Sequence, residues 1–120
     1  MARILLADDD AATRAIIERA LGADGHVVTS TQDGAEALER LQASGAFDLL
    51  ISDVQMPAVD GIALAEKGLA AQPKLKVILI SGFADELDRA EHLRKRKIAR
   101  LVAKPITLEG IRAAVRAALG

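Results

Sequence analysis

The sequence of 120 residues contains no cysteine, no tryptophan and no tyrosine, and only two phenylalanines. The absence of cysteine excludes disulfide bonds, thiolate nucleophiles and cysteine-ligated metals. With so few aromatic rings, the core must be packed from leucine, isoleucine, valine and alanine. The chain also lacks a strong charge of either sign, with a net charge of −1. This balance gives no reason to expect a nucleic acid or an anionic membrane as a partner.

Long apolar runs are missing as well. No run approaches the ~20 residues that a membrane-spanning helix needs. The apolar run at the amino terminus is short and ends at Asp8, unlike the apolar region of a signal peptide. We therefore expect a soluble, cytoplasmic protein that contacts no membrane. The length lies near the modal size of one domain, and no linker or low-complexity stretch divides it, so we expect a single domain over residues 1–120.

What the sequence does have is an alternation of short apolar runs with segments of helical periodicity. The runs predict strands near 2–7, 26–30, 47–52, 76–80 and 98–103. Helical patterns lie between and after them, with boundaries expected at Gly22, near Gly45, at Asp60-Gly61 and at Gln72-Pro73. Strands separated by helices favour a parallel α/β sheet, and the unbroken apolar character of the central runs predicts helices on both of its faces.

The segment from Ala84 to Arg100 carries the weakest of these helical patterns. Its apolar stripe is narrow and lies among many charged residues. Such a thinly anchored element is typical of the parts of a protein that move. Two readings stay open: a helix that shifts with the state of the site, or an ordinary solvated surface helix.

Four of the predicted strands deliver a polar side chain at the carboxyl end. Asp8 and Asp9 follow the first, Asp53 closes the third, Ser81 the fourth, and Lys104 follows the fifth. In open parallel sheets, ligands bind outside the carboxyl ends of the strands. Three acids, a hydroxyl and an amine that converge there predict a magnesium and phosphoryl site.

These residues also carry a family resemblance. Together, in order and over the whole chain, five motifs resemble the signature of two-component response regulator receiver domains: Asp8-Asp9, Asp53 with Met56-Pro57, Asp60-Gly61, Ser81-Gly82 and Lys104-Pro105. The resemblance implies a flavodoxin-like (CheY-like) doubly wound sheet with the parallel strand order 2-1-3-4-5 and five helices. It also implies that the protein works in phosphorelay signal transduction.

The resemblance further assigns roles. Asp53 would accept a phosphoryl group from the phosphohistidine of a histidine kinase or histidine phosphotransferase, while Lys104 and Ser81 would contact phosphoryl oxygens. Mg²⁺ would be held by Asp9, Asp53 and the carbonyl of Gln55, with Asp8 acting through a metal-bound water. The Lys104-Pro105 bond would be cis. The chain would then be a phosphoacceptor rather than an enzyme, at most catalysing its own phosphorylation and autodephosphorylation.

Other readings of the same residues remain. An acid before a helix is often only an N-cap, and Asp10 is the best candidate for that role. Ser81 could be a turn residue, and Lys104 a solvated side chain. A haloacid-dehalogenase-type phosphatase also uses a nucleophilic Asp, but its motif would need a hydroxyl where this chain has Ala12. A third reading is a protein-binding module with an inactive site.

The output of such a receiver is less specified by the sequence. Since no segment follows the last helix except Gly120, we expect a stand-alone monomer that acts by binding a protein. The stretches 1–10 and 80–84 are similar to a stand-alone alphaproteobacterial regulator that steers a ClpXP-type protease, which implies such a protease as a partner. The alternative is the receiver domain of a hybrid histidine kinase. Leu101 stands where many receivers have an aromatic ring, so we expect a switch to use Phe83 and the segment after it.

Overall fold

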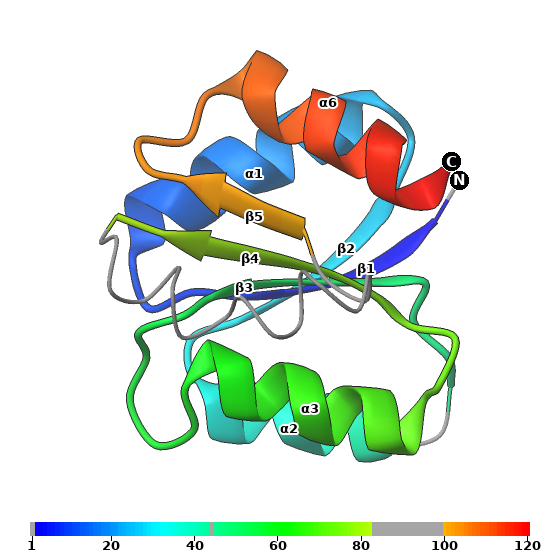
Figure 1. Cartoon of the computed structure of the whole chain (residues 1–120). Helices are drawn as coiled ribbons and strands as arrows, with labels where there is room; N and C mark the ends of the chain where they lie inside the picture. Colours follow the sequence, from blue (N-terminus) through cyan, green and yellow to red (C-terminus); the bar gives the residue numbers. More distant parts are fainter. Residues whose placement is uncertain (1, 44, 83–99) are drawn as a thin grey trace.

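The computed structural model describes residues 2–43, 45–82 and 100–120 of the chain (Figure 1). Five strands form one sheet in the order β2-β1-β3-β4-β5, and every neighbouring pair is parallel. The strands are β1 (Arg3–Ala7), β2 (Val27–Thr31), β3 (Leu49–Asp53), β4 (Lys76–Ser81) and β5 (Arg100–Ala103). The predicted fold class and strand order are confirmed.

Helices cover both faces of this sheet. Figure 1 shows α1 (Ala11–Ala23) and α6 (Leu108–Leu119) on one face, and α2 (Gly34–Gln42) and α3 (Gly61–Ala71) on the other. The fifth helix that the resemblance implied, between β4 and β5, falls in residues 83–99, outside the described residues. Within the described ranges, no helix is long and apolar enough to cross a membrane.

Each described helix begins at a residue whose side chain accepts a hydrogen bond from the first turn. These N-caps are Asp10, Asp33, Asp60 and Thr107. Such a cap satisfies a backbone N–H that has no partner within the helix, and its loss typically costs ~1 kcal/mol. The expected start of α3 at Asp60-Gly61 and its end before Pro73 are confirmed.

The end of one helix differs from the sequence prediction. Helix α1 continues past Gly22 to Ala23, because the left-handed turn that ends it lies at Gly25, where φ is +83°. Helix α2 ends at Gln42, near Gly45 as expected, because Ala43 already has an extended backbone with ψ of 171°. A nearby glycine therefore indicates the region in which each helix ends, but not the last helical residue.

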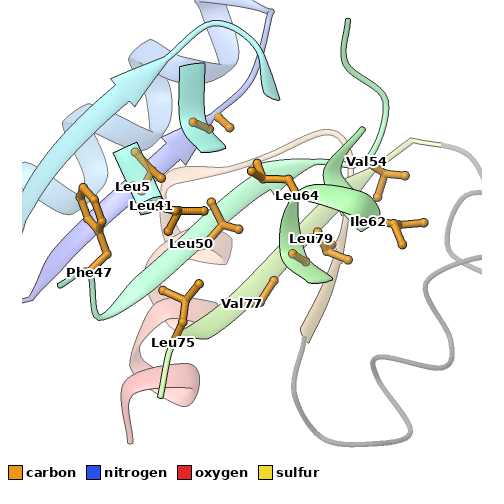
Figure 2. Packing of buried hydrophobic residues seen from close by; sticks show 13 residues of the cluster. Leu5, Leu41, Phe47, Leu50, Val54, Ile62, Leu64, Leu75, Val77 and Leu79 are labelled. Atoms are coloured by element: carbon orange, nitrogen blue, oxygen red, sulfur yellow. The ribbon is translucent and has the colours of Figure 1, made fainter. Parts of the chain in front are cut away.

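The sheet divides the hydrophobic core into two layers. One layer packs the sheet against α2 and α3, and these of its members are labelled in Figure 2: Leu5, Leu41, Phe47, Leu50, Val54, Ile62, Leu64, Leu75, Val77 and Leu79. The other layer packs it against α1 and α6 through residues such as Ile17, Ile51 and Ile111. Strand β3 is buried along its whole length, as expected for a central strand covered on both faces, whereas the edge strands β2 and β5 are partly exposed.

Candidate functional site

Three carboxylates meet at the carboxyl ends of β1 and β3. Oxygen atoms of Asp8, Asp9 and Asp53 all lie within 4.8 Å of one another. Asp8 is fully buried and Asp53 is only 5% exposed, while Asp9 is exposed. Asp9 and Asp53 line a cavity of about 470 Å³, whose other described lining residues are Gln55, Met56, Pro57, Gly82 and Lys104. The structure therefore brings the predicted acids and the predicted lysine together.

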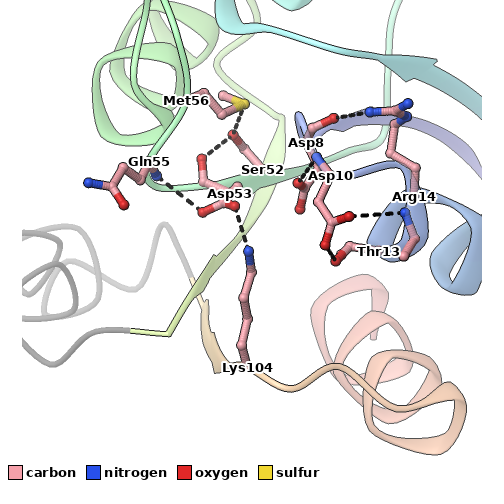
Figure 3. A network of polar contacts seen from close by, with 10 residues as sticks. Asp8, Asp10, Thr13, Arg14, Ser52, Asp53, Gln55, Met56 and Lys104 are labelled. Carbon is pink, nitrogen blue, oxygen red and sulfur yellow. Dashed lines mark hydrogen bonds and ion pairs between the residues drawn. The ribbon is translucent and has the colours of Figure 1, made fainter.

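Lys104 pairs directly with Asp53 across the cavity (Figure 3). Its Nζ lies 2.7 Å from Oδ2 of Asp53, and the backbone N–H of Gln55 donates to Oδ1 at 3.1 Å. Partial burial acts to lower the pKa of Lys104, but the hydrogen bond and the charge of Asp53 outweigh it and raise that pKa above its usual range. Lys104 is therefore a fixed cation that faces the carboxylate predicted to be the phosphoacceptor.

Asp8 lies deepest in the site and is incompletely satisfied. Its Oδ1 accepts the backbone N–H of Asp10 at 2.8 Å, while its buried Oδ2 has no hydrogen-bond partner among the described residues. Burial raises the pKa of Asp8 to about 6; the N–H of Asp10 opposes this shift and the charge of Asp53 adds to it. Buried polar atoms are normally paired, so this oxygen indicates a place for a water or a cation.

The donor set fits a small, hard divalent cation. Mg²⁺ prefers oxygen ligands and keeps several waters. Three clustered carboxylates supply both the charge and the oxygen atoms, and one buried oxygen has no partner in the described part of the chain. The exposed side chain of Asp9 and the open cavity beside it leave room for bound water.

The loop from β3 to α3 is held close to Asp53 by two glycines. A Cβ at Gly61 would lie 2.1 Å from the carbonyl oxygen of Asp53, and one at Gly34 would lie 1.9 Å from the carbonyl of Val59. Neither position can carry a larger side chain without a shift of the main chain. In the same loop, Ala58 has a φ of +70°, which non-glycine residues rarely adopt. The main chain beyond Asp53 therefore has a narrowly defined path.

The remaining predicted residues lie at the ends of β4 and β5. Ser81 is fully buried and is absent from the described lining of the cavity; its carbonyl accepts the backbone N–H of Lys104 at 2.9 Å. The Lys104-Pro105 peptide bond is cis, as the resemblance implied. Leu101 is half-buried and packs on the core layer beneath α2 and α3. Phe83, expected to take part in a switch, lies outside the described residues.

Two neighbours of the acids escaped sequence analysis. Arg14 Nη1 donates to the carbonyl of Asp8 at 2.7 Å, and Thr13 Oγ1 donates to Asp10 at 2.8 Å. Figure 3 shows both side chains reaching back from α1 to the turn that follows β1. Asp10 is the N-cap of α1, as expected. The spacing of Asp10 and Thr13 could have indicated their bond, but the reach of Arg14 to a backbone carbonyl has no signal in the sequence.

Comparisons with known proteins agree with this geometry. The family model described as the response regulator receiver domain matches residues 4–116. The chain is 46% identical to the response regulator receiver protein CpdR of Brucella abortus over 84 residues, which are 70% of this chain and 69% of CpdR. It is 35% identical to the DNA-binding transcriptional regulator NtrC of Escherichia coli over 97% of this chain, but spans only 24% of NtrC.

Solved structures support the same assignment. The crystal structure of the receiver domain from the hybrid histidine kinase CckA superposes with a TM-score of 0.81 at 33% identity, covering 98% of this chain and 99% of that domain. The expected similarity to CpdR and to the receiver domain of a hybrid histidine kinase is confirmed. The chain belongs to the response regulator receiver family of two-component systems.

Proposed function

We propose that Asp53 is the phosphoacceptor of this receiver. The observation that carries the proposal is the ion pair between Asp53 and Lys104, 2.7 Å long, set beside the clustered acids Asp8 and Asp9. Asp53 lies at the end of the central strand, between the cation of Lys104 and a candidate cation site. Positive charges on both sides can neutralise the charge of an incoming phosphoryl group. Receiver domains are phosphorylated by histidine kinases, so the donor is the phosphohistidine of a kinase or a histidine phosphotransferase.

The proposed transfer depends on positioning and charge. An oxygen of Asp53 attacks the phosphorus, the P–N bond of the phosphohistidine breaks, and the imidazole leaves as the acyl phosphate forms. Such reactions depend on stabilising the charge of the phosphoryl oxygens. In this proposal the ammonium of Lys104 forms an ion pair with one of these oxygens, and the hydroxyl of Ser81 donates a hydrogen bond to another. The chain acts as a phosphoacceptor, at most catalysing its own phosphorylation and autodephosphorylation, and is not otherwise an enzyme.

Mg²⁺ is the proposed cofactor. The residues proposed to hold it are Asp9, Asp53 and the backbone carbonyl of Gln55, with Asp8 contacting a metal-bound water. Receiver domains generally bind this ion at an acidic pocket, and the cluster of three acids fits that description. When bound, the ion neutralises phosphoryl charge and offsets the mutual repulsion of the carboxylates. The full burial of Asp8 and the exposure of Asp9 support this division of roles.

Intact mass measurement tests the phosphoacceptor. Incubation with acetyl phosphate and Mg²⁺ should add one phosphoryl group to the wild-type chain and none to Asp53→Asn. Asp48→Asn is a matched control, because Asp48 precedes the same strand at its opposite end and lies outside the acid cluster. It should be phosphorylated at the wild-type rate. Phosphorylation of Asp53→Asn at that rate would reject the assignment.

For the output, we propose that phosphorylation controls binding to another protein. We further propose that residues 1–120 form one receiver domain acting as a cytoplasmic monomer. The similarity to CpdR supports a regulator of this kind, with a ClpXP-type protease as the proposed target. Binding of the purified unfoldase subunit of this ClpXP-type protease should differ between the free chain and the chain with beryllofluoride and Mg²⁺. Asp53→Asn should abolish the difference. Equal binding in both states would reject this target.

A receiver module of a hybrid histidine kinase is the second candidate, favoured by the match to the CckA receiver over nearly its whole length. In that case the chain would receive its phosphoryl group from the kinase to which it is joined. The flanking reading frame distinguishes the two. Kinase domains encoded in frame with residues 1–120 would identify a hybrid kinase, whereas a stop codon after position 120 and no upstream coding sequence would identify a stand-alone regulator.

A further inference from the structure

A second hollow lies at the opposite end of the sheet from the acidic site. It has a volume of about 560 Å³ and is bounded by residues 46–48 before β3, by the connection from α3 to β4, and by Leu119 at the end of α6. Figure 2 shows Phe47 and Leu75 at this amino end of the sheet and Val54 at the other. The five residues of β3 run from one end of the sheet to the other and span about 16 Å at the ~3.3 Å rise of parallel strands.

The walls of this hollow are fixed by hydrogen bonds. Gln72 Nε2 donates to the carbonyl of Leu41 at 2.8 Å, and its Oε1 accepts the N–H of Phe47 at 2.9 Å. The backbone N–H of Leu75 donates to the carbonyl of Gln72 at 3.0 Å, and that of Lys76 to the carbonyl of Asp48 at 3.1 Å. Because these walls are already ordered, a ligand that binds in the hollow loses little binding free energy to ordering them.

Its floor is apolar. Phe47 and Leu75 belong to the core and are 8% and 4% exposed. Leu119 adds a third apolar side chain, 36% exposed, from the other face of the sheet. Apolar floors of this kind take the large side chains that anchor protein interfaces.

Its rim is positively charged. Lys74 and Lys76 are exposed and form no ion pair within the described part of the chain. The guanidinium of Arg3 lies 5.0 Å from the centre of the Phe47 ring and donates to the carbonyl of Ala46. Asp48 and the carbonyl end of α6, which is equivalent to roughly half a charge, oppose these cations. Among the charged side chains that line the hollow, the two lysines outnumber the single carboxylate of Asp48, which favours an anionic ligand.

We infer that this hollow is a docking site for an acidic peptide segment of a partner protein, with one large apolar side chain seated on Phe47, Leu75 and Leu119. Carboxylates on either side of that anchor would meet Lys74 and Lys76. The hollow lies at the far end of the sheet from Asp53, so docking does not require phosphorylation. The site would hold a partner in both states of the receiver, while the acidic site changes state.

The test uses the full chain labelled with ¹⁵N and a heptapeptide with Leu-Phe at its centre and acidic residues around it. Millimolar peptide should shift the amide signals of residues 46–48 and 74–76, equally in wild type and in Asp53→Asn. The same peptide with Ser-Ser at its centre, or with lysines in place of the acids, should bind at least tenfold more weakly. Equal binding of the basic peptide, or no shifts at these residues, would overturn the inference.

Variants with equal charge changes locate the site. Lys74→Glu with Lys76→Glu should weaken binding at least tenfold, whereas Arg40→Glu with Lys67→Glu, exposed positions on α2 and α3 outside the hollow, should not. Thermal unfolding verifies that both double variants are folded. Equal weakening by the two pairs would overturn the inference. So would binding of phosphatidylserine vesicles in place of the peptide, or self-association through this surface in sedimentation, because each assigns the hollow to another occupant.

Discussion

The α-carbon of Gly61 packs against the main chain of Asp53 so closely that a Cβ added there would lie 2.1 Å from the Asp53 carbonyl oxygen. The first residue of α3 is thus in contact with the last residue of β3. This contact determines how tightly the loop between them can close around the carboxylate of Asp53. The backbone N–H of Gly61 also donates to the carbonyl of Val54 at 2.8 Å.

Gly61→Ala should therefore lower the free energy of unfolding by about 1–3 kcal/mol, because the added methyl group forces backbone shifts in a packed site. Gly22→Ala is the matched control: it lies in α1, and a Cβ there meets nothing within 4 Å. That substitution should stabilise the chain by about 0.5–1 kcal/mol, the usual gain over glycine in a helix. Urea unfolding measures both, and a neutral Gly61→Ala would contradict the contact.

The metal-free stability should depend on pH through Asp8. Its pKa of about 6 in the folded chain lies above the usual value of 3.8, so between these values the folded state binds more protons than the unfolded state. Its contribution to stability is therefore complete below pH ~4 and is lost as the pH rises through ~6. At 1.36 kcal/mol per pKa unit, the loss amounts to about 1–3 kcal/mol.

Asp8→Asn removes this titration. With EDTA present, the variant should be more stable than wild type by about 1–3 kcal/mol at pH 7, and nearly equal to it at pH 4. Chemical unfolding at several pH values measures both proteins. A constant difference between Asp8→Asn and wild type across this range would disagree with the assignment.

Magnesium affinity should distinguish the two neighbouring acids. Asp9 is exposed and lines the cavity, whereas Asp8 is buried behind it, so we expect Asp9 to bind the ion directly and Asp8 to act through water. Asp9→Asn should then weaken Mg²⁺ binding more than Asp8→Asn. Replacing a residue that only contacts a ligand of the metal can still lower the affinity about 10–100-fold. Calorimetric titration of both variants decides; equal losses or the reverse order would reject the distinction.

The ion pair between Lys104 and Asp53 should be visible as a coupling energy. Lys104→Gln leaves the nearly buried carboxylate of Asp53 unpaired, which should cost about 1–2 kcal/mol in metal-free buffer, since partial exposure of the lysine screens the pair. In an Asp53→Asn background the same change should cost little. A double-mutant cycle by urea unfolding measures the difference. Equal costs in both backgrounds would show that the contact contributes nothing to stability.

The sequence predicted local features better than long-range ones. Asp60-Gly61 could be read as a helix start because an N-cap involves only neighbouring residues, and the apolar runs of β1, β3 and β4 reflect burial that both faces impose. The acids could be grouped because parallel strands all end at the same edge. By contrast, Arg112 forms a two-bond pair with Asp24 across 88 residues, and no local pattern indicates it.

The close approaches were also beyond sequence reasoning. The sequence predicts Gly61 only as part of a helix start and gives no signal for Gly34. The packed structure shows that a Cβ at either position would meet a backbone carbonyl. The positive φ of Ala58 was equally hidden, because alanine gives no sign of a left-handed turn. Steric limits of this kind arise between segments, whereas sequence patterns report preferences within one segment.

The candidate site is assembled from segments that are far apart in the chain: Asp8 follows β1, Asp53 ends β3, and Lys104, which contacts Asp53 across 51 residues, follows β5. No fragment of the sheet contains all of them. A chain still being synthesised, or one in which the last strand has detached, holds the carboxylate without its counter-charge. In the proposed function, the ability of Asp53 to accept a phosphoryl group is therefore a property of the finished fold. Detachment of β5 would take Lys104 away from Asp53 even if β1 and β3 stayed in place.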